Sequence, residues 1–313
     1  MKMKNLLALV MASVMAFAMV GCGAVSVDGE KKAETAAEGE AAAEEAGNGS
    51  IGLAISTLNN PFFVTLSEGA EAKAEELGVE LIVVDAGDDA AKQTSNVEDL
   101  ISKNISVLII NPVDSDAAAP AVKDAIAAGI KVIAVDRVVN GVEVDCEIAS
   151  DNVAGAQAAT EYLLELVGEG AKVAELQGVS GASATIARGE GFHIVADEKL
   201  DVVASQTANF NRAEGMTVME NMLQANPDIV GVFAHNDEMA LGAVEAIGDK
   251  DIVVVGFDAT DDAVAAVGAG TMAATVAQQP DLMGATAVET AVALINGETV
   301  EKSLPVAVTL VTE

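Results

Sequence analysis

The chain has 313 residues and carries 49 acidic against 16 basic side chains, a net charge of −33. Nucleic-acid binding needs clustered Lys and Arg to displace counterions, so this balance excludes a nucleic-acid partner. Hydrophobic residues make up 51% and charged residues 21% of the chain, which is typical of a globular protein. The two cysteines, Cys22 and Cys146, provide no zinc-binding spacing and no disulfide framework.

Residues 1–21 have the pattern of a lipoprotein signal peptide. Two lysines precede the apolar run Leu6 to Val20, which is shorter than the about 20 residues that a membrane-spanning helix needs. The run continues into Met19-Val20-Gly21-Cys22, which resembles a bacterial lipobox with Cys22 as the lipidated residue. Two acyl chains on Cys22 are enough for stable anchoring on the outer face of the cell membrane. The alternative is an ordinary signal peptide with a chance cysteine, which predicts a free periplasmic protein.

Residues 22–49 are predicted to form an acidic, low-complexity tether. The stretch is rich in Ala, Glu and Gly and has no apolar face to bury. A solvated tether after a lipidated cysteine lifts the following domain off the membrane, and its negative charge keeps it away from anionic lipid.

From Ile51 onward, short apolar runs rich in β-branched residues alternate with longer segments of helical period. The predicted strands are Ile51–Ile55, Glu80–Val84, Val107–Ile110, Lys131–Val135, Lys172–Leu176, Val202–Ala204, Ile229–Phe233, Asp251–Val255 and Ala273–Ala277. The predicted helices are Pro61–Leu77, Ala90–Lys103, Ala117–Ala128, Ala154–Val167, Thr185–Ala196, Arg212–Gln224, Asp237–Ile247, Asp261–Val267 and Asp281–Asn296.

This alternation predicts parallel sheets covered by helices on both faces. There are too many units for one small sheet, so the fold class is α/β with two Rossmann-like lobes in series. One eight-stranded barrel is the structural alternative. Polar residues follow several of the predicted strands, among them Asn60, Asp136, Asn236, Asp258 and Gln278. Ligands bind outside the carboxyl ends of strands in open parallel sheets, so these residues are expected to share one cleft.

The aromatic residues add to this expectation. The chain has no Trp, one Tyr and seven Phe. Phe62, Phe63, Phe210 and Phe257 stand beside polar residues at predicted strand ends, helix starts or loops. A sugar ring packs its C–H faces on aromatic planes while its hydroxyls need fixed donors and acceptors. Carboxylates, amides and the planar forks of arginine provide these. Singly, each residue is equally well read as a helix cap, a turn residue or a surface pair.

Seven ordered motifs, covering Ser50 to the C-terminus, resemble those of the ribose-binding proteins of bacterial ABC importers. They are Ser56-Thr57-Leu58-Asn59-Asn60-Pro61-Phe62-Phe63, Asn111-Pro112-Val113-Asp114-Ser115-Asp116, Ile148-Ala149-Ser150-Asp151-Asn152, Glu175-Leu176-Gln177-Gly178, Arg188-Gly189-Glu190-Gly191-Phe192, Asn236-Asp237-Glu238-Met239-Ala240-Leu241-Gly242 and Val255-Gly256-Phe257-Asp258.

The resemblance implies a set of ligand contacts at matching positions: Asn60, Phe62, Phe63, Asp136, Arg137, Arg188, Phe210, Asn236, Phe257, Asp258 and Gln278. His235 departs from the family pattern, in which Gln is usual. Ile186, Ala187 and Cys146 are further departures.

The resemblance also implies the domain organisation and the mode of action. It places an N-terminal lobe at 50–150 plus 279–307 and a C-terminal lobe at 151–278 plus 308–313, joined by a three-stranded hinge with crossovers near Ser150, Gln278 and Ala307. It implies a monomer that binds D-ribose between its lobes by hinge closure, without a cofactor or metal, and delivers the sugar to a membrane permease.

Other readings predict different sequence features. An enzyme would need a nucleophile beside its base, and His235 has none nearby, while His193 is expected on a helix surface. No dinucleotide or phosphate loop is present. A sugar-sensing regulator would carry a basic DNA-binding segment in place of the export signal. Another monosaccharide, such as allose, another pentose or a furanose-like signal molecule, and a second role as a chemoreceptor ligand both stay open.

Overall fold

The computed structural model describes residues 49–312. The predicted signal peptide, Cys22 and nearly all of the predicted tether lie outside the described residues. Within this range there are nine α-helices and twelve β-strands, arranged around two six-stranded sheets. No helix of the described part is both long and apolar enough to span a bilayer.

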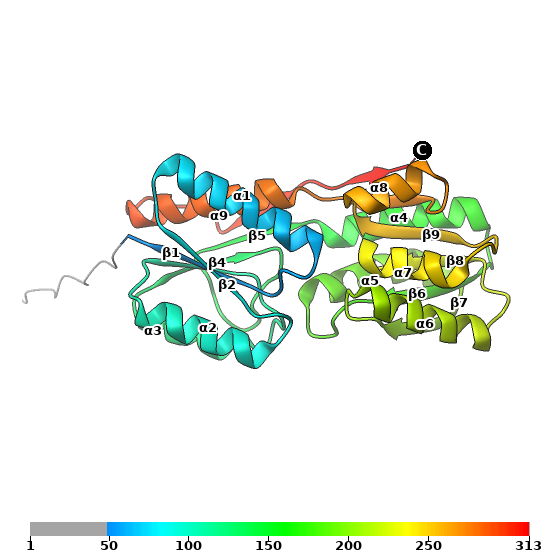
Figure 1. Cartoon of the computed structure of the whole chain (residues 1–313), viewed down its shortest axis with the longest axis horizontal. Helices are drawn as coiled ribbons and strands as arrows, with labels where there is room; N and C mark the ends of the chain where they lie inside the picture. The colour runs from blue at the N-terminus through cyan, green and yellow to red at the C-terminus, as the bar shows by residue number, and fades with distance from the viewer. Residues whose placement is uncertain (1–48, 313) are drawn as a thin grey trace, which may run out of the picture. The chain divides into compact units, whose positions relative to one another are not determined.

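The first sheet has the strand order β11-β5-β4-β3-β1-β2, and all its pairs are parallel. Helices α1 and α9 pack on one face and α2 and α3 on the other (Figure 1). The strands are β1 (Ile51–Ile55), β2 (Leu81–Asp85), β3 (Val107–Ile110), β4 (Lys131–Val135), β5 (Cys146–Ser150) and β11 (Ser303–Val306). The helices are α1 (Pro61–Leu77), α2 (Ala90–Ser102), α3 (Ala119–Ala127) and α9 (Pro280–Ile295).

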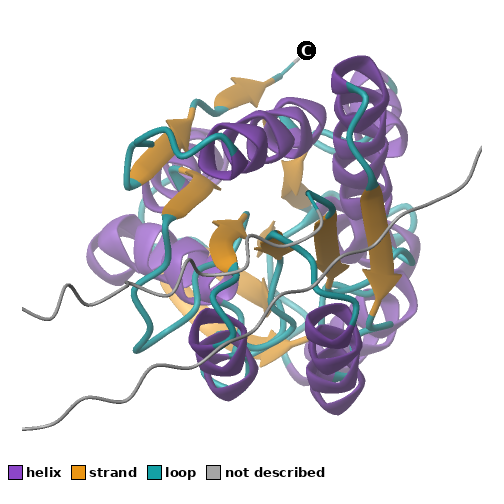
Figure 2. Ribbon diagram, turned by 90° about the vertical axis from the view of Figure 1, so that its left-hand side faces the viewer, coloured by secondary structure: helices purple, strands orange, loops and turns teal. Residues whose placement is uncertain are grey.

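The second sheet has the strand order β12-β10-β9-β8-β6-β7. Helices α4 and α5 cover one face and α6, α7 and α8 the other. Figure 2, viewed from the side of the first lobe, shows strands lying between helices. The strands are β6 (Lys172–Gln177), β7 (Asp201–Thr207), β8 (Gly231–Ala234), β9 (Val253–Asp258), β10 (Ala274–Ala277) and β12 (Thr309–Val311). The helices are α4 (Asn152–Val167), α5 (Ser183–Lys199), α6 (Arg212–Ala225), α7 (Asp237–Ile247) and α8 (Asp261–Gly268).

The two-lobed α/β architecture is confirmed, and the single-barrel alternative is wrong because the sheets are separate and open. Sequence reasoning missed β5, β11 and β12. The last two are short, and β11 contains Pro305, which lacks a backbone donor and is confined to sheet edges. In addition, β12 pairs antiparallel with β10, whereas only parallel pairing was expected.

The chain passes between the two sheets three times. It leaves the first sheet after β5 and enters the second lobe at α4. It returns from β10 to α9, and it crosses once more between β11 and β12. These passages bring the carboxyl ends of the central strands of both sheets toward the same region of the molecule.

Glycines let three helix pairs approach backbone to backbone. In α1 and α9, a Cβ added to Gly284 would lie 2.0 Å from the carbonyl oxygen of Leu66, and one added to Gly69 would lie 2.3 Å from that of Asp281. Gly242 stands equally close to α6, and Gly191 to α4. Any side chain at these positions would force the packed helices apart.

Candidate functional site

A small cavity lies where the strand ends of the two lobes meet, with about 230 Å³ of space free of protein atoms. Its lining residues come from both lobes and are mostly buried: Asn60, Phe62, Phe63, Asp136, Arg137, Ala184, Arg188, Phe210, Asn236 and Asp258. Charged, amide and aromatic groups surround this space.

The segment after β1 supplies an amide and two rings. The side-chain oxygen of Asn60 caps α1 by accepting from the backbone N–H of Phe62 at 2.9 Å, and Pro61 begins the helix. The rings of Phe62 and Phe63 meet edge to face, with centroids 5.1 Å apart. Both rings are buried, so the helix start presents them inward as one apolar wall.

The segment after β4 supplies an acidic and a basic group side by side. Asp136 and Arg137 are each only 3% exposed, and the Arg137 Nε lies 3.6 Å from the Asp136 Oδ2. Asn111, which follows β3, donates to the same carboxylate oxygen at 3.1 Å. Arg137 donates from Nη1 to the carbonyl of Pro112 at 3.0 Å. Burial raises the pKa of Asp136 and lowers that of Arg137, because each charge loses its hydration.

The second lobe supplies a matching pair of opposite charges. Arg188 on α5 lies 3.5 Å from the Asp258 Oδ1 at the end of β9, and its guanidinium stacks 3.9 Å above the centre of the Phe257 ring. Its Nε donates to the side chain of Asn152 at 2.8 Å. Gln278, after β10, donates to the Asp258 Oδ1 at 2.6 Å. Burial raises the pKa of Asp258 well above its usual value.

Phe210 and Asn236 complete the second-lobe wall. The Phe210 ring lies against Gly178, where an added Cβ would come within 2.1 Å of the ring. The guanidinium of Arg137 lies 5.4 Å and that of Arg188 5.9 Å from the centre of this ring, so Phe210 contacts the arginines of both lobes. Asn236 caps α7 through the backbone N–H of Met239 at 3.0 Å.

Three site residues have a left-handed backbone although none of them is glycine. The φ angles are +64° at Asp136, +57° at Phe210 and +127° at Asp258. Such residues cost on the order of 1–3 kcal/mol each and collect where function requires a particular side-chain direction. The strain is therefore a second, independent indication that this cavity is the functional site.

Several polar atoms in the site have no hydrogen-bond partner among the described residues. They are the Asp136 Oδ1, the Arg137 Nε and the Gln278 Oε1. Leaving a buried donor or acceptor unpaired costs about 1–3 kcal/mol. Together they offer two acceptors and one donor in fixed positions, the pattern that the hydroxyls of a small polyol can satisfy.

The lobes also touch directly beside the cavity, through hydrogen bonds that involve no site residue. The backbone N–H of Ser115 donates to the carbonyl of Gly181 at 2.9 Å, and its hydroxyl accepts from the N–H of Ser183 at 3.2 Å. The Ser183 hydroxyl accepts from the N–H of Val138 at 3.0 Å. A Cβ on Gly181 would lie 1.7 Å from the Asp114 carboxylate, so a side chain there would displace that carboxylate.

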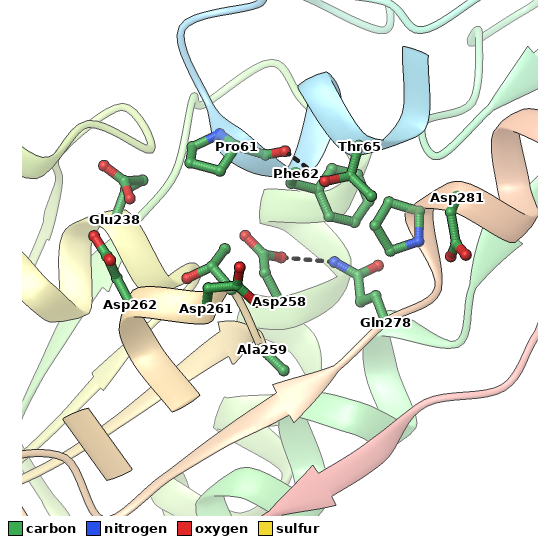
Figure 3. A pocket seen from close by; sticks show the side chains of 12 residues that line it. Pro61, Phe62, Thr65, Glu238, Asp258, Ala259, Asp261, Asp262, Gln278 and Asp281 are labelled. Carbon is green, nitrogen blue, oxygen red and sulfur yellow. Dashed lines mark hydrogen bonds between the residues drawn. The ribbon is translucent and has the colours of Figure 1, made fainter. Parts of the chain in front are cut away.

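A second, wider pocket opens beside Asp258 and Gln278 (Figure 3). Its rim carries the carboxylates of Glu238, Asp261, Asp262 and Asp281. Within residues 49–312, no group of three or more His, Cys, Asp or Glu side chains is arranged to hold a metal ion. The pocket adjoins the site, because Phe62 and Asp258 line both.

All but two of the contacts predicted from the sequence line the cavity. Phe257 instead lies fully buried beneath Arg188, and Gln278 reaches the site through Asp258. Sequence reasoning assigned no role to Asn111 or Asn152, which hold Asp136 and Arg188 in place. Asn111 directly follows β3 and Asn152 lies two residues after β5, and both stand in motifs that carry the family resemblance, so two signals were available.

A two-lobed fold with a buried polar and aromatic cavity at the strand ends of both sheets defines a small-molecule binding protein. The family model described as "Periplasmic binding protein domain" matches residues 51–299, and the chain belongs to this family. The family takes its name from an extracytoplasmic compartment.

Individual relatives show which members of the family this chain resembles. The chain is 52% identical over 265 residues to the ribose import binding protein of Bacillus subtilis (strain 168), covering 84% of this chain and 87% of the relative. It is 51% identical to the ribose import binding protein of Escherichia coli (strain K12), covering 83% and 90%. A solved ABC transporter solute binding protein from Bacillus halodurans C-125 with bound myo-inositol superimposes with a TM-score of 0.81 at 35% identity, covering 86% of this chain and 96% of that one.

Proposed function

We propose that this chain is the extracytoplasmic binding protein of an ABC sugar importer and that its ligand is D-ribose. The observation that carries the proposal is the pairing of two buried ion pairs, Asp136 with Arg137 and Arg188 with Asp258, across a cavity walled by phenylalanine rings. Identity above 50% to ribose import binding proteins supports ribose as the sugar.

In this proposal the contacts are the eleven residues predicted from the sequence, divided between lobes at 50–150 plus 279–307 and 151–278 plus 308–313. The carboxylates accept from sugar hydroxyls, the arginines donate to them, and the rings cover the C–H faces. Binding closes the hinge, and a membrane permease recognises the closed form of the monomer.

The protein acts as a carrier without catalysis. The His235 ring is fully buried and hydrogen-bonded to Glu175, which leaves it no access to a substrate as a base. The similarity to a structure with bound myo-inositol supports an alternative ligand class, namely another cyclic polyol or monosaccharide.

D-ribose is expected to raise the melting temperature of the mature protein, because a ligand that binds only the folded state stabilises it. Glucose and galactose are expected to leave it unchanged, because the proposed site is specific for ribose, as the identity to ribose import binding proteins supports. Thermal melts with each sugar at equal concentration check this. Equal shifts with all three sugars would contradict the ribose assignment.

We further propose that Cys22 is lipidated and holds the protein on the outer face of the cell membrane, with residues 22–49 as a tether. Replacing Cys22 with alanine is expected to move the protein from the membrane fraction to the soluble fraction, because the acyl chains supply the anchoring energy. Fractionation of cells expressing either form, with Cys146→Ala as the matched control, measures this. Unchanged fractionation of Cys22→Ala would refute the anchor.

A further inference from the structure

Both histidines of the chain converge on one buried carboxylate behind the ligand cavity. Glu175 on β6 and His235 after β8 have no exposed side-chain surface, and the His235 Nε2 lies 2.9 Å from the Glu175 Oε1. The Nε2 of His193, on α5, lies 3.5 Å from the other carboxylate oxygen, and its Nδ1 lies 2.7 Å from Asp197. Three elements that are distant in sequence thus build this cluster.

Glu175 is held in its ionised form. The hydroxyl of Ser205 and the amide of Gln177 donate to its Oε2. Burial alone would raise the pKa of Glu175, but the hydrogen bonds from His235 and Ser205 and the nearby histidines outweigh burial and keep the pKa below its usual value. Glu175 is a buried anion whose partners are titratable groups and neutral donors. The energy of its charge therefore depends on whether the titratable partners are protonated.

His235 connects this anion to the ligand site. Its backbone carbonyl accepts a hydrogen bond from the Nη1 of Arg188, and the next residue, Asn236, lines the cavity. With Nε2–H donating to Glu175, the ring's Nδ1 is unprotonated, and it has no hydrogen-bond partner among the described residues. A second proton would place an unpaired N–H and a positive charge behind Arg188.

We propose that Glu175 and His235 form a titratable pair that positions Arg188, so that protonation of His235 weakens ligand binding. The inference rests on the proposed function and adds regulation by pH to it. Burial lowers the pKa of His235 in spite of the neighbouring Glu175. When the lobes close, Arg188 loses hydration and its charge is screened less. The repulsion between Arg188 and a protonated His235 therefore costs more free energy in the closed form than in the open form. Because the pKa of His235 lies below that of an ordinary histidine, the affinity falls only on the acid side of that ordinary pKa.

Other groups titrate near His235 and must be separated from it. Glu175 faces it from β6, and His193 and Arg188 face it from α5. Asp237 on α7, whose pKa burial raises to about 7, and Asp258 on β9 lie near Arg188. The wild-type pH profile alone thus mixes several titrations. His235→Gln keeps a donor for Glu175 but does not titrate, so its difference from the wild type isolates His235.

The experiment measures D-ribose affinity by calorimetry at pH 7.5 and pH 5.0 for the wild type, His235→Gln and His193→Gln. The loss of affinity at low pH is expected to be about threefold to tenfold larger in the wild type than in His235→Gln. His193→Gln is expected to respond like the wild type. Equal losses in the wild type and His235→Gln, or a lost response in His193→Gln alone, would overturn the proposal.

A second measurement needs no ligand. The Nε–H resonance of Arg188 in the sugar-free protein is expected to shift further between the two pH values in the wild type than in His235→Gln, where only the carboxylates near Arg188 still titrate. A resonance that moves no further in the wild type than in His235→Gln also overturns the proposal. If ribose binds none of the proteins at pH 7.5, the proposed function fails, and the resonance of Arg188 decides the inference on its own.

Discussion

Replacing Arg188 with alanine is expected to weaken D-ribose binding more than a hundredfold, about 3 kcal/mol or more. The change removes donors to the ligand and leaves the Asp258 carboxylate, which lies 3.5 Å from the guanidinium, buried without its counter-charge. It also leaves an empty space over the Phe257 ring, where the guanidinium had stacked. Isothermal titration calorimetry measures the effect.

Arg212→Ala is the matched control. Arg212 pairs with Glu238 and Asp262 at the rim, is 35% exposed in its side chain and does not line the cavity. Its loss is expected to change affinity by less than about threefold, because rim ion pairs contribute about 0–1 kcal/mol. Arg188→Lys keeps the charge but loses the planar fork. Its loss of affinity is expected to lie between that of Arg188→Ala and that of Arg212→Ala. Wild-type affinity in Arg188→Ala would show that the ligand binds elsewhere.

Gly284→Ala is expected to destabilise the fold by about 2–3 kcal/mol, although alanine favours helices by about 1 kcal/mol over glycine. The added methyl group would lie 2.0 Å from the Leu66 carbonyl oxygen and 2.8 Å from the Ala70 nitrogen, and these backbone atoms cannot move without separating α1 from α9. Urea denaturation followed by circular dichroism measures the loss.

Gly268→Ala provides the comparison, since it makes the same chemical change in another helix. A Cβ at Gly268, the last residue of α8, meets nothing within 4 Å. This variant is expected to match the wild type or to gain up to about 1 kcal/mol. If both variants unfold at the same urea concentration, close helix packing is not the reason for glycine at 284.

Elements with local signals were predictable to the residue. Helix α1 begins at Pro61 after the Asn60 cap and ends before Gly78, whose φ of +68° terminates it. Two of the three missed strands, β11 and β12, have no such signals, because they are short and owe their conformation to neighbours in the sheets. Their pairing is a property of the whole fold.

The same distinction holds for the site. Asp136, Arg137, Asn236 and Asp258 follow strands, and the sheet topology alone brings such residues together. The Glu175 cluster follows this rule only in part: the pairing of β6 with β8 brings Glu175 near His235, whereas His193 reaches it from α5 by packing alone. His193 was expected on a helix surface. Its side chain is 39% exposed, and its inner edge contacts the buried Glu175.

The hydrogen bonds around Ser115 and Ser183 bear on kinetics. They join the lobes without touching the cavity, so they resist separation whichever sugar is bound. If the lobes close on a sugar as proposed, its exit requires these bonds and the sugar contacts to break, whereas entry into open lobes requires neither. The lifetime of the complex is therefore set in part by Gly181 and its partners, and two sugars with different contacts share this part of the barrier to release.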